Sequence, residues 1–221
     1  RNFFFIKPEA VLSYMPVPGR QTRMRLAREV SQLNFNDFVS ATVFEDDDLA
    51  LGNPNLRPDT TWIAEASQEQ RLGRETVFKL TAFHHWISDV LDLLPLTADF
   101  EAPGNIGDGR RWGLELDGTI PLEWLGLTGA KLDLNFLWQD SSVTDPVTGE
   151  DRVLSAIGTS GESGFFNVEN RYVYSVDFRQ DFQNARAAWG FFMQERAEQP
   201  RFKVNELEIN DEDIEFNAYI E

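Results

Sequence analysis

The sequence has no cysteine and only two histidines among its 221 residues. Without cysteine, neither disulfide bonds nor thiolate chemistry are available to the chain. Basic residues are also scarce, since 20 Lys and Arg stand against 37 Asp and Glu and leave a formal net charge of −17. Nucleic-acid binders draw much of their affinity from cationic side chains at phosphates. We therefore expect no nucleic-acid partner.

Long apolar runs are missing too. No stretch approaches about 18 uninterrupted apolar residues, the length that indicates a transmembrane helix. A membrane β-strand needs only about 9–11 residues of alternating character, so a β-barrel stays open. Aromatic residues are plentiful, with 18 Phe, 6 Trp and 4 Tyr. Such side chains fit a packed core, and they also fit the interfacial girdles of a membrane barrel.

Residues suited to catalysis lack the spacing that catalysis requires. His84 and His85 are adjacent, so on a strand they point to opposite faces and cannot clamp one metal ion. No Gly-x-Ser-x-Gly elbow is present to support a catalytic triad. Glu65 and Glu69 share a parity, which we interpret as polar positions of a lumen rather than as a glycosidase pair. We expect no enzymatic activity and no cofactor.

Two acidic clusters, Glu45–Asp48 and Asp211–Asp213, allow two interpretations. Their oxygen atoms suit calcium, but neither cluster has the ligand order of an EF-hand loop. Runs of like charge are usually solvated loop segments. We favour the solvated loop for both clusters.

Alternation of apolar and polar residues predicts nine β-strands. The clearest is Thr128–Asp140, where one parity is apolar and the other is largely polar. In Thr22–Gln32, by contrast, Arg28 interrupts an otherwise apolar parity. The predicted strands are Pro8–Tyr14, Thr22–Gln32, Thr60–Leu72, Glu75–Ile87, Arg110–Ile120, Thr128–Asp140, Tyr172–Phe182, Ala187–Arg196 and Ile214–Glu221.

The connections between these strands alternate strictly between short and long. In an antiparallel up-and-down meander, this puts every short turn at one end and every long loop at the other. Within the long connections, Asn36–Val39 is consistent with a short helical turn. Val90–Leu96 is apolar enough to continue the preceding strand past a bulge. The short connections lie near 16–21, 73–74, 121–127 and 183–186, and the long ones near 33–59, 88–109, 141–170 and 197–212.

Several short motifs follow one another in a fixed order. Asn53–Asp59 reads Asn-Pro-Asn-Leu-Arg-Pro-Asp, and two long strands with a tight turn follow. Asn105 and Gly107 then form an Asn-x-Gly motif, and Gly113-Leu114-Glu115 ends the series. This order resembles the C-terminal barrel half of TonB-dependent outer-membrane receptors. A weaker resemblance covers most of the chain.

The resemblance implies an all-β fold. We expect an antiparallel up-and-down meander of about nine strands that forms part of a 22-stranded transmembrane β-barrel. Residues 1–221 would then be a partial barrel domain, from which the N-terminal plug and the closing strands are absent. Lipid would face Leu114, Leu116, Leu132, Leu134, Phe136 and Trp138, and the lumen would contain Glu115, Asp117, Asp133, Asn135, Asp177 and Arg179.

The resemblance also implies a function. The expected role is TonB-dependent uptake of a scarce ligand, a siderophore, cobalamin or an oligosaccharide, across the outer membrane of a Gram-negative bacterium. Expected partners are outer-membrane lipid, the TonB system acting through the plug, and a small ligand such as a metal chelate or an oligosaccharide. The candidate ligand-binding residues of the loops and upper lumen are Phe44, Asp46, Asp47, Phe100, Arg110, Phe165 and Phe166.

Two other functions stay open at this point. A passive porin-type barrel would share the alternation and the loop asymmetry, but not the ordered motifs. A soluble all-β carbohydrate-binding module is favoured by the high charge and by the mean hydropathy of −0.37. An N-terminal plug would distinguish a receptor from a porin, and solubility without detergent would favour the soluble module.

Overall fold

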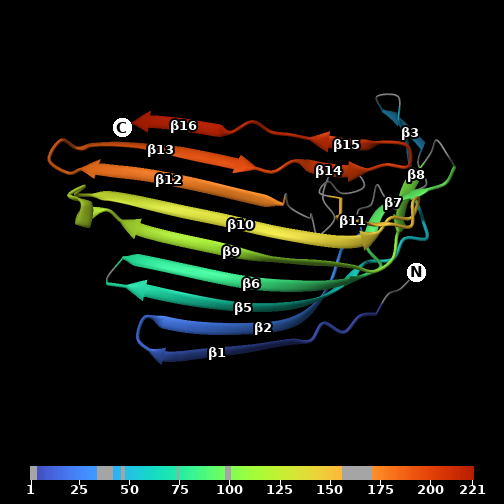
Figure 1. The fold of residues 1–221 in the computed structure, drawn as a ribbon, viewed down its shortest axis with the longest axis horizontal. Helices are drawn as coiled ribbons and strands as arrows, with labels where there is room; N and C mark the ends of the chain where they lie inside the picture. The colour runs from blue at the N-terminus through green and yellow to red at the C-terminus, as the bar shows by residue number, and fades with distance from the viewer. Residues whose placement is uncertain (1–3, 34–41, 46–47, 74, 98–100, 156–170) are drawn as a thin grey trace.

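A computed structural model describes the chain except at residues 1–3, 34–41, 46–47, 74, 98–100 and 156–170, and the side chains of 42–51 are not described either. Nine long strands form one sheet in chain order (Figure 1). Every neighbouring pair is antiparallel, which confirms the predicted meander. The strands are β1 (Glu9–Val17), β2 (Arg20–Val30), β5 (Thr60–Leu72), β6 (Thr76–Ser88), β9 (Gly109–Pro121), β10 (Ala130–Thr144), β12 (Tyr172–Phe182), β13 (Ala187–Arg196) and β16 (Glu215–Ile220).

The short turns lie together at one end of the sheet, the turn end, and the long connections lie at the other, the loop end (Figure 1). At the first turn the structure differs from the prediction. β1 continues past Pro16 to Val17, with a register shift between Tyr14 and Val17. Proline is tolerated there because β1 is an edge strand of this sheet and the ladder is already irregular.

The long connections contain hairpins that the sequence did not predict. β3 (Thr42–Glu45) pairs with β4 (Asp48–Leu51), β7 (Leu91–Pro95) with β8 (Glu101–Asn105), and β14 (Gln199–Phe202) with β15 (Leu207–Asn210). A two-residue strand, β11 (Asp151–Arg152), pairs antiparallel with the end of β10.

The prediction that Val90–Leu96 prolongs the preceding strand is wrong. Asp89 has a positive φ of 60° directly after β6, and the chain leaves the main sheet there. β7 then pairs with β8 in a sheet of its own. The predicted helical turn at Asn36–Val39 lies outside the described residues.

The two faces of the sheet differ as predicted. Residues paired across strands share a face, and Leu116 pairs with Leu80 and Phe136. On the opposite face, Asp117 pairs with Lys79 and Asn135. The first is called the apolar face and the second the polar face. The register confirms the predicted facing of β9, β10 and β12.

Four tryptophans follow a diagonal line across the apolar face. Trp62 and Trp86 are direct cross-strand partners on β5 and β6. Trp112 on β9 lies one row nearer the turn end, and Trp138 on β10 lies one row further still. A row corresponds to two residues along a strand. If this line of tryptophans runs perpendicular to the axis of a barrel, the shift corresponds to a strand tilt of roughly 40° from that axis. Such a tilt is typical of β-barrels.

Two small clusters of buried apolar side chains lie at the two ends of the sheet. At the loop end, Ile87, Val90, Val143 and Leu154 are buried together. At the turn end, Leu122 packs against the strands, with Ala130 and Phe178 in its cluster. The described helical structure is one 3-10 turn, η1 (Glu123–Leu125). No helix among the described residues is long and apolar enough to cross a membrane.

Candidate functional site

The motif residues at the loop end join two long connections. The backbone N–H of Arg57 donates to Oδ1 of Asn105 at 3.0 Å, and Nδ2 of Asn105 donates to the carbonyls of Arg57 and Asp89, both at 2.8 Å. Nδ2 of Asn53 donates to the Pro103 carbonyl at 2.9 Å. An asparagine side chain supplies both a donor and an acceptor, so Asn105 can bridge two backbones at once.

Arg152 links three of the long connections, near 88–109, 141–170 and 197–212, through a buried ion pair network. Its Nη2 lies 3.0 Å from Oδ2 of Asp92 on β7, and its Nε lies 2.7 Å from Oδ2 of Asp145. Its guanidinium carbon lies 4.1 Å from the ring centroid of Phe202 on β14. Ser155 completes the network by donating from Oγ to Oδ2 of Asp92 at 2.8 Å. This arrangement, the Arg152 network, connects β11 with the β7–β8 and β14–β15 hairpins.

Burial sets the electrostatics of this network. Burial raises the pKa of Asp92, while the charge of Arg152 and the hydrogen bonds that Asp92 accepts oppose that rise. Asp145 differs: burial raises its pKa, but hydrogen bonds from the backbone of Thr148 and Val147 and from Arg152 outweigh burial, and the pKa falls. Asp92 therefore depends on Arg152 to stay ionised more than Asp145 does.

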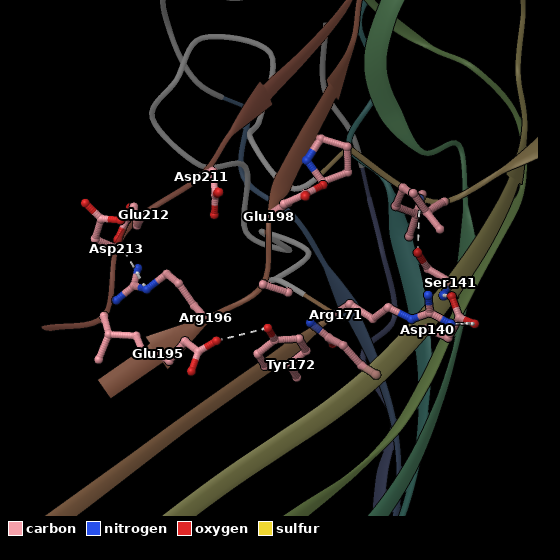
Figure 2. Close-up of a pocket in the computed structure, with 16 residues that line it drawn as sticks. Asp140, Ser141, Arg171, Tyr172, Glu195, Arg196, Glu198, Asp211, Glu212 and Asp213 are labelled. Atoms are coloured by element: carbon pink, nitrogen blue, oxygen red, sulfur yellow. Dashed lines mark hydrogen bonds and ion pairs between the residues drawn. The ribbon is translucent and has the colours of Figure 1, made fainter. Parts of the chain in front are cut away.

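A cavity of about 600 Å³ opens at the loop end beside the start of β12. Figure 2 shows Asp211, Glu212 and Asp213 on one side of it, with Asp140 and Arg171 on the other. Six carboxylates and two guanidinium groups line the cavity. Such a surface favours cationic or neutral polar groups and disfavours anions.

Several cavity residues are already bound to one another. Glu195 accepts hydrogen bonds from the hydroxyls of Tyr172, at 3.2 Å, and Tyr174. Arg196 pairs with Glu212 at 3.4 Å. No group of three or more histidine or acidic side chains among the described residues is arranged to hold a metal ion.

The polar face carries charged side chains in cross-strand clusters. Arg25 pairs with Glu9 at 2.8 Å, with Glu29 at 2.5 Å and with Glu65 at 3.4 Å. Glu65 is therefore occupied by an ion pair. His85 lies on this face and is buried, whereas His84 lies on the opposite face with its ring 4.3 Å from that of Trp86. The two histidines do not meet, as their spacing predicted.

The structure describes two of the seven candidate ligand-binding residues. Phe44 lies on β3 opposite Leu49. Arg110 lies near the start of β9 on the apolar face, with its guanidinium carbon 5.5 Å from the ring centroid of Trp112. A residue of the upper lumen would lie on the polar face, and Arg110 does not lie on that face. Asp46, Asp47, Phe100, Phe165 and Phe166 lie outside the described residues.

The Arg152 network is the feature that sequence reasoning missed. One signal was available, because Asp92 is a single carboxylate inside the apolar run Val90–Leu96. A charge in such a run is costly to bury without a partner. Nothing in the local pattern identifies that partner, which lies 60 residues away.

A further buried carboxylate, Asp59, makes the loop end sensitive to pH. Asp59 is only 6% exposed, and its Oδ1 has no hydrogen-bond partner among the described residues. Its backbone N–H donates to the hydroxyl of Ser31 at 3.1 Å. Burial raises the pKa of Asp59 from 3.8 to about 6, although hydrogen bonds from Ser31 lower it.

This pKa predicts weaker local structure at neutral pH. Because the folded pKa exceeds the unfolded one, Asp59 stabilises the fold below about pH 4, and that contribution is lost as pH rises through about 6. In the full-length protein, amide exchange near Asp59, corrected for intrinsic rates, should show about 1–3 kcal/mol less protection at pH 7.5 than at pH 5. Asp59→Asn should remove this difference. Equal protection of the native protein at both pH values would contradict the prediction.

A family model described as TonB dependent receptor-like, beta-barrel matches residues 5–207. No curated protein matches the chain. Among solved structures, the siderophore receptor PirA from Acinetobacter baumannii is similar with a TM-score of 0.63 and 12% identity, covering 97% of this chain and 34% of that one.

Two further solved structures have the same fold. A mutant of the ferric enterobactin receptor PfeA from Pseudomonas aeruginosa, in complex with enterobactin, has a TM-score of 0.62 and 14% identity, covering 97% of this chain and 32% of that chain. The FrpB iron transporter from Neisseria meningitidis, F5-1 variant, has a TM-score of 0.61 and 12% identity, with the same coverage. The chain thus spans about a third of the length of these solved structures.

Proposed function

The chain belongs to the TonB-dependent receptor-like β-barrel family, and from this we propose that it forms part of the barrel wall of an outer-membrane receptor. The receptor takes up a scarce ligand with energy supplied through TonB. In this proposal residues 1–221 are one part of a 22-stranded barrel that also holds a plug. The family match over residues 5–207 carries the proposal.

The apolar face supports a membrane position over a soluble module. Trp86 is 50% exposed and Leu80 is 49% exposed, and both lie in a band of exposed apolar side chains. Soluble monomers rarely expose apolar patches as large as a continuous sheet face. In a bilayer the same face would contact acyl chains, and the paired strands would satisfy their backbone groups.

The packed loop end supports a receptor over a passive pore. Ile87 and Val143 on the polar face are buried against Leu154 from a long connection. A passive channel needs an open, water-filled lumen. Loops that pack onto the wall narrow that path, as expected for a protein that binds its ligand before admitting it.

For the ligand we propose a metal chelate. The similar solved structures are a siderophore receptor, a ferric enterobactin receptor and an iron transporter. These structures are similar to the chain in fold alone. We therefore infer the charge of the chelate from the residues of this chain. The acidic cavity at the loop end favours a chelate that is neutral or cationic over one with several negative charges.

Uptake by the full-length receptor tests the proposal. Cells that express it should accumulate radiolabelled iron from a neutral or cationic ferric hydroxamate, and cells that lack TonB should not. A polyanionic ferric catecholate and a maltooligosaccharide serve as comparison ligands. Uptake that persists without TonB would favour the passive pore. Uptake of the oligosaccharide alone would overturn the assignment of the ligand.

A further inference from the structure

Arg28 is a charged residue at a position of β2 where the alternation predicts an apolar one. The proposed uptake of a ligand does not explain its presence there. Its cross-strand partner is Trp62 on β5, so Arg28 lies on the apolar face. In the same row Trp62 pairs with Trp86, and Trp86 pairs with Arg110. One row therefore runs arginine, tryptophan, tryptophan, arginine across four neighbouring strands.

This row lies where the apolar band ends on β5 and β6. One row toward the turn end, the apolar face carries Leu26 on β2 and Ala64 on β5. One row toward the loop end, it carries Thr60 and Ser88, which pair with each other. In a membrane barrel this border is the depth at which lipid headgroups meet acyl chains, and tryptophan is enriched there.

Neither arginine of the row has a carboxylate partner within the described part of the chain. Most other arginines do, as Arg57 does with Asp89 at 2.6 Å. On the strand beside Arg110, the apolar-face carboxylate Asp140 is engaged by Arg171 at 3.7 Å. In a protein with a net charge of −17, two arginines on one apolar face that no described carboxylate neutralises can bind an anion from outside the chain.

We propose that Arg28, Trp62, Trp86 and Arg110 form a docking row in which each arginine binds the phosphate of a membrane lipid headgroup. A guanidinium binds phosphate through two parallel hydrogen bonds, and its alkyl stem can lie along apolar surface. The tryptophan rings between the arginines offer apolar contact to the first acyl carbons. Continuity with the apolar band favours a lipid over a free anion. The proposal rests on the membrane position proposed above.

Lipid titration of the full-length receptor tests the site. Native mass spectrometry should detect phosphatidylglycerol binding that Arg28→Gln and Arg110→Gln each weaken about five-fold and the double variant about twenty-fold. Arg28→Lys and Arg110→Lys should recover part of the loss because they restore the charge. Arg23→Gln is the matched control, since Arg23 lies on the polar face of the same strand. It should leave the affinity unchanged.

The outcomes separate this site from the membrane position itself. Quenching of tryptophan fluorescence by brominated lipid should persist in every variant. Quenching with unchanged lipid affinity in the double variant would overturn the site alone, whereas absence of quenching in the native receptor would overturn the membrane position as well. Equal binding of phosphatidylcholine, or full competition by inorganic phosphate at the same concentration, would also overturn the assignment to a lipid phosphate.

Discussion

Replacing Arg152 by methionine should lower the stability of the loop end more than replacing any other single charged residue that we describe. Arg152 and Asp92 have side-chain exposures of 9% and 4%, so neither charge has much contact with water. Methionine keeps the apolar bulk near Phe202 but removes the charge. Asp92 is then left buried without its cation, which typically costs about 3–5 kcal/mol.

Hydrogen exchange of the full-length receptor measures this effect. The free energy of local opening for β7, β11 and β14 should fall by that amount, while the central strands keep their protection. Arg171→Met is the matched control, because Arg171 is 66% exposed and lies 3.7 Å from Asp140. It should cost less than about 1 kcal/mol.

Two rescues identify the cause as the unpaired carboxylate. The double variant Arg152→Met/Asp92→Asn should regain most of the lost protection, because it removes the buried charge. Lowering the pH should also help the single variant, since burial raises the pKa of Asp92 and protonation neutralises it. A group with a raised folded pKa stabilises at low pH, so protection should fall as pH rises. Loss without either rescue would contradict the ion pair explanation.

A charge placed on the apolar face at mid-depth should destabilise the barrel strongly. Leu134 lies on β10 opposite Gly118 and Val176, midway between Trp138 and the turn end of its strand. In the proposed membrane position, Leu134→Arg places a guanidinium in the centre of the acyl chains. The expected loss in the free energy of unfolding is about 2–4 kcal/mol.

The next residue supplies the matched control. Asn135 lies on the polar face, and its Nδ2 is 3.3 Å from Oγ of Ser175. Asn135→Arg should cost less than about 1 kcal/mol, since its cross-strand partner Asp117 is a carboxylate. Urea titration of the full-length receptor in phospholipid vesicles, followed by tryptophan fluorescence, measures both variants. Equal losses would contradict the membrane assignment of the apolar face.

The facing of residues such as Leu134 and Asn135 was determined by sequence alone. A β-strand has a side-chain period of two, so alternation along one strand assigns its faces without reference to any other strand. The order of short and long connections likewise determined which end carries the turns. Pro58, which cannot donate to a ladder, and Gly19, which adopts a φ of 84° in the first turn, are local signals of the same kind, because each acts within one or two residues.

The tertiary structure decided what depends on contacts between distant segments. Val90–Leu96 has the composition of a continuing strand, yet its partner is β8 rather than the main sheet. The pairing of Arg152 with Asp92 spans 60 residues, and the diagonal of tryptophans exists only after the register of four strands is set. Local periodicity reports which face a residue takes. Which residues lie beside it follows from hydrogen-bond register and burial between strands, and these are properties of the folded sheet.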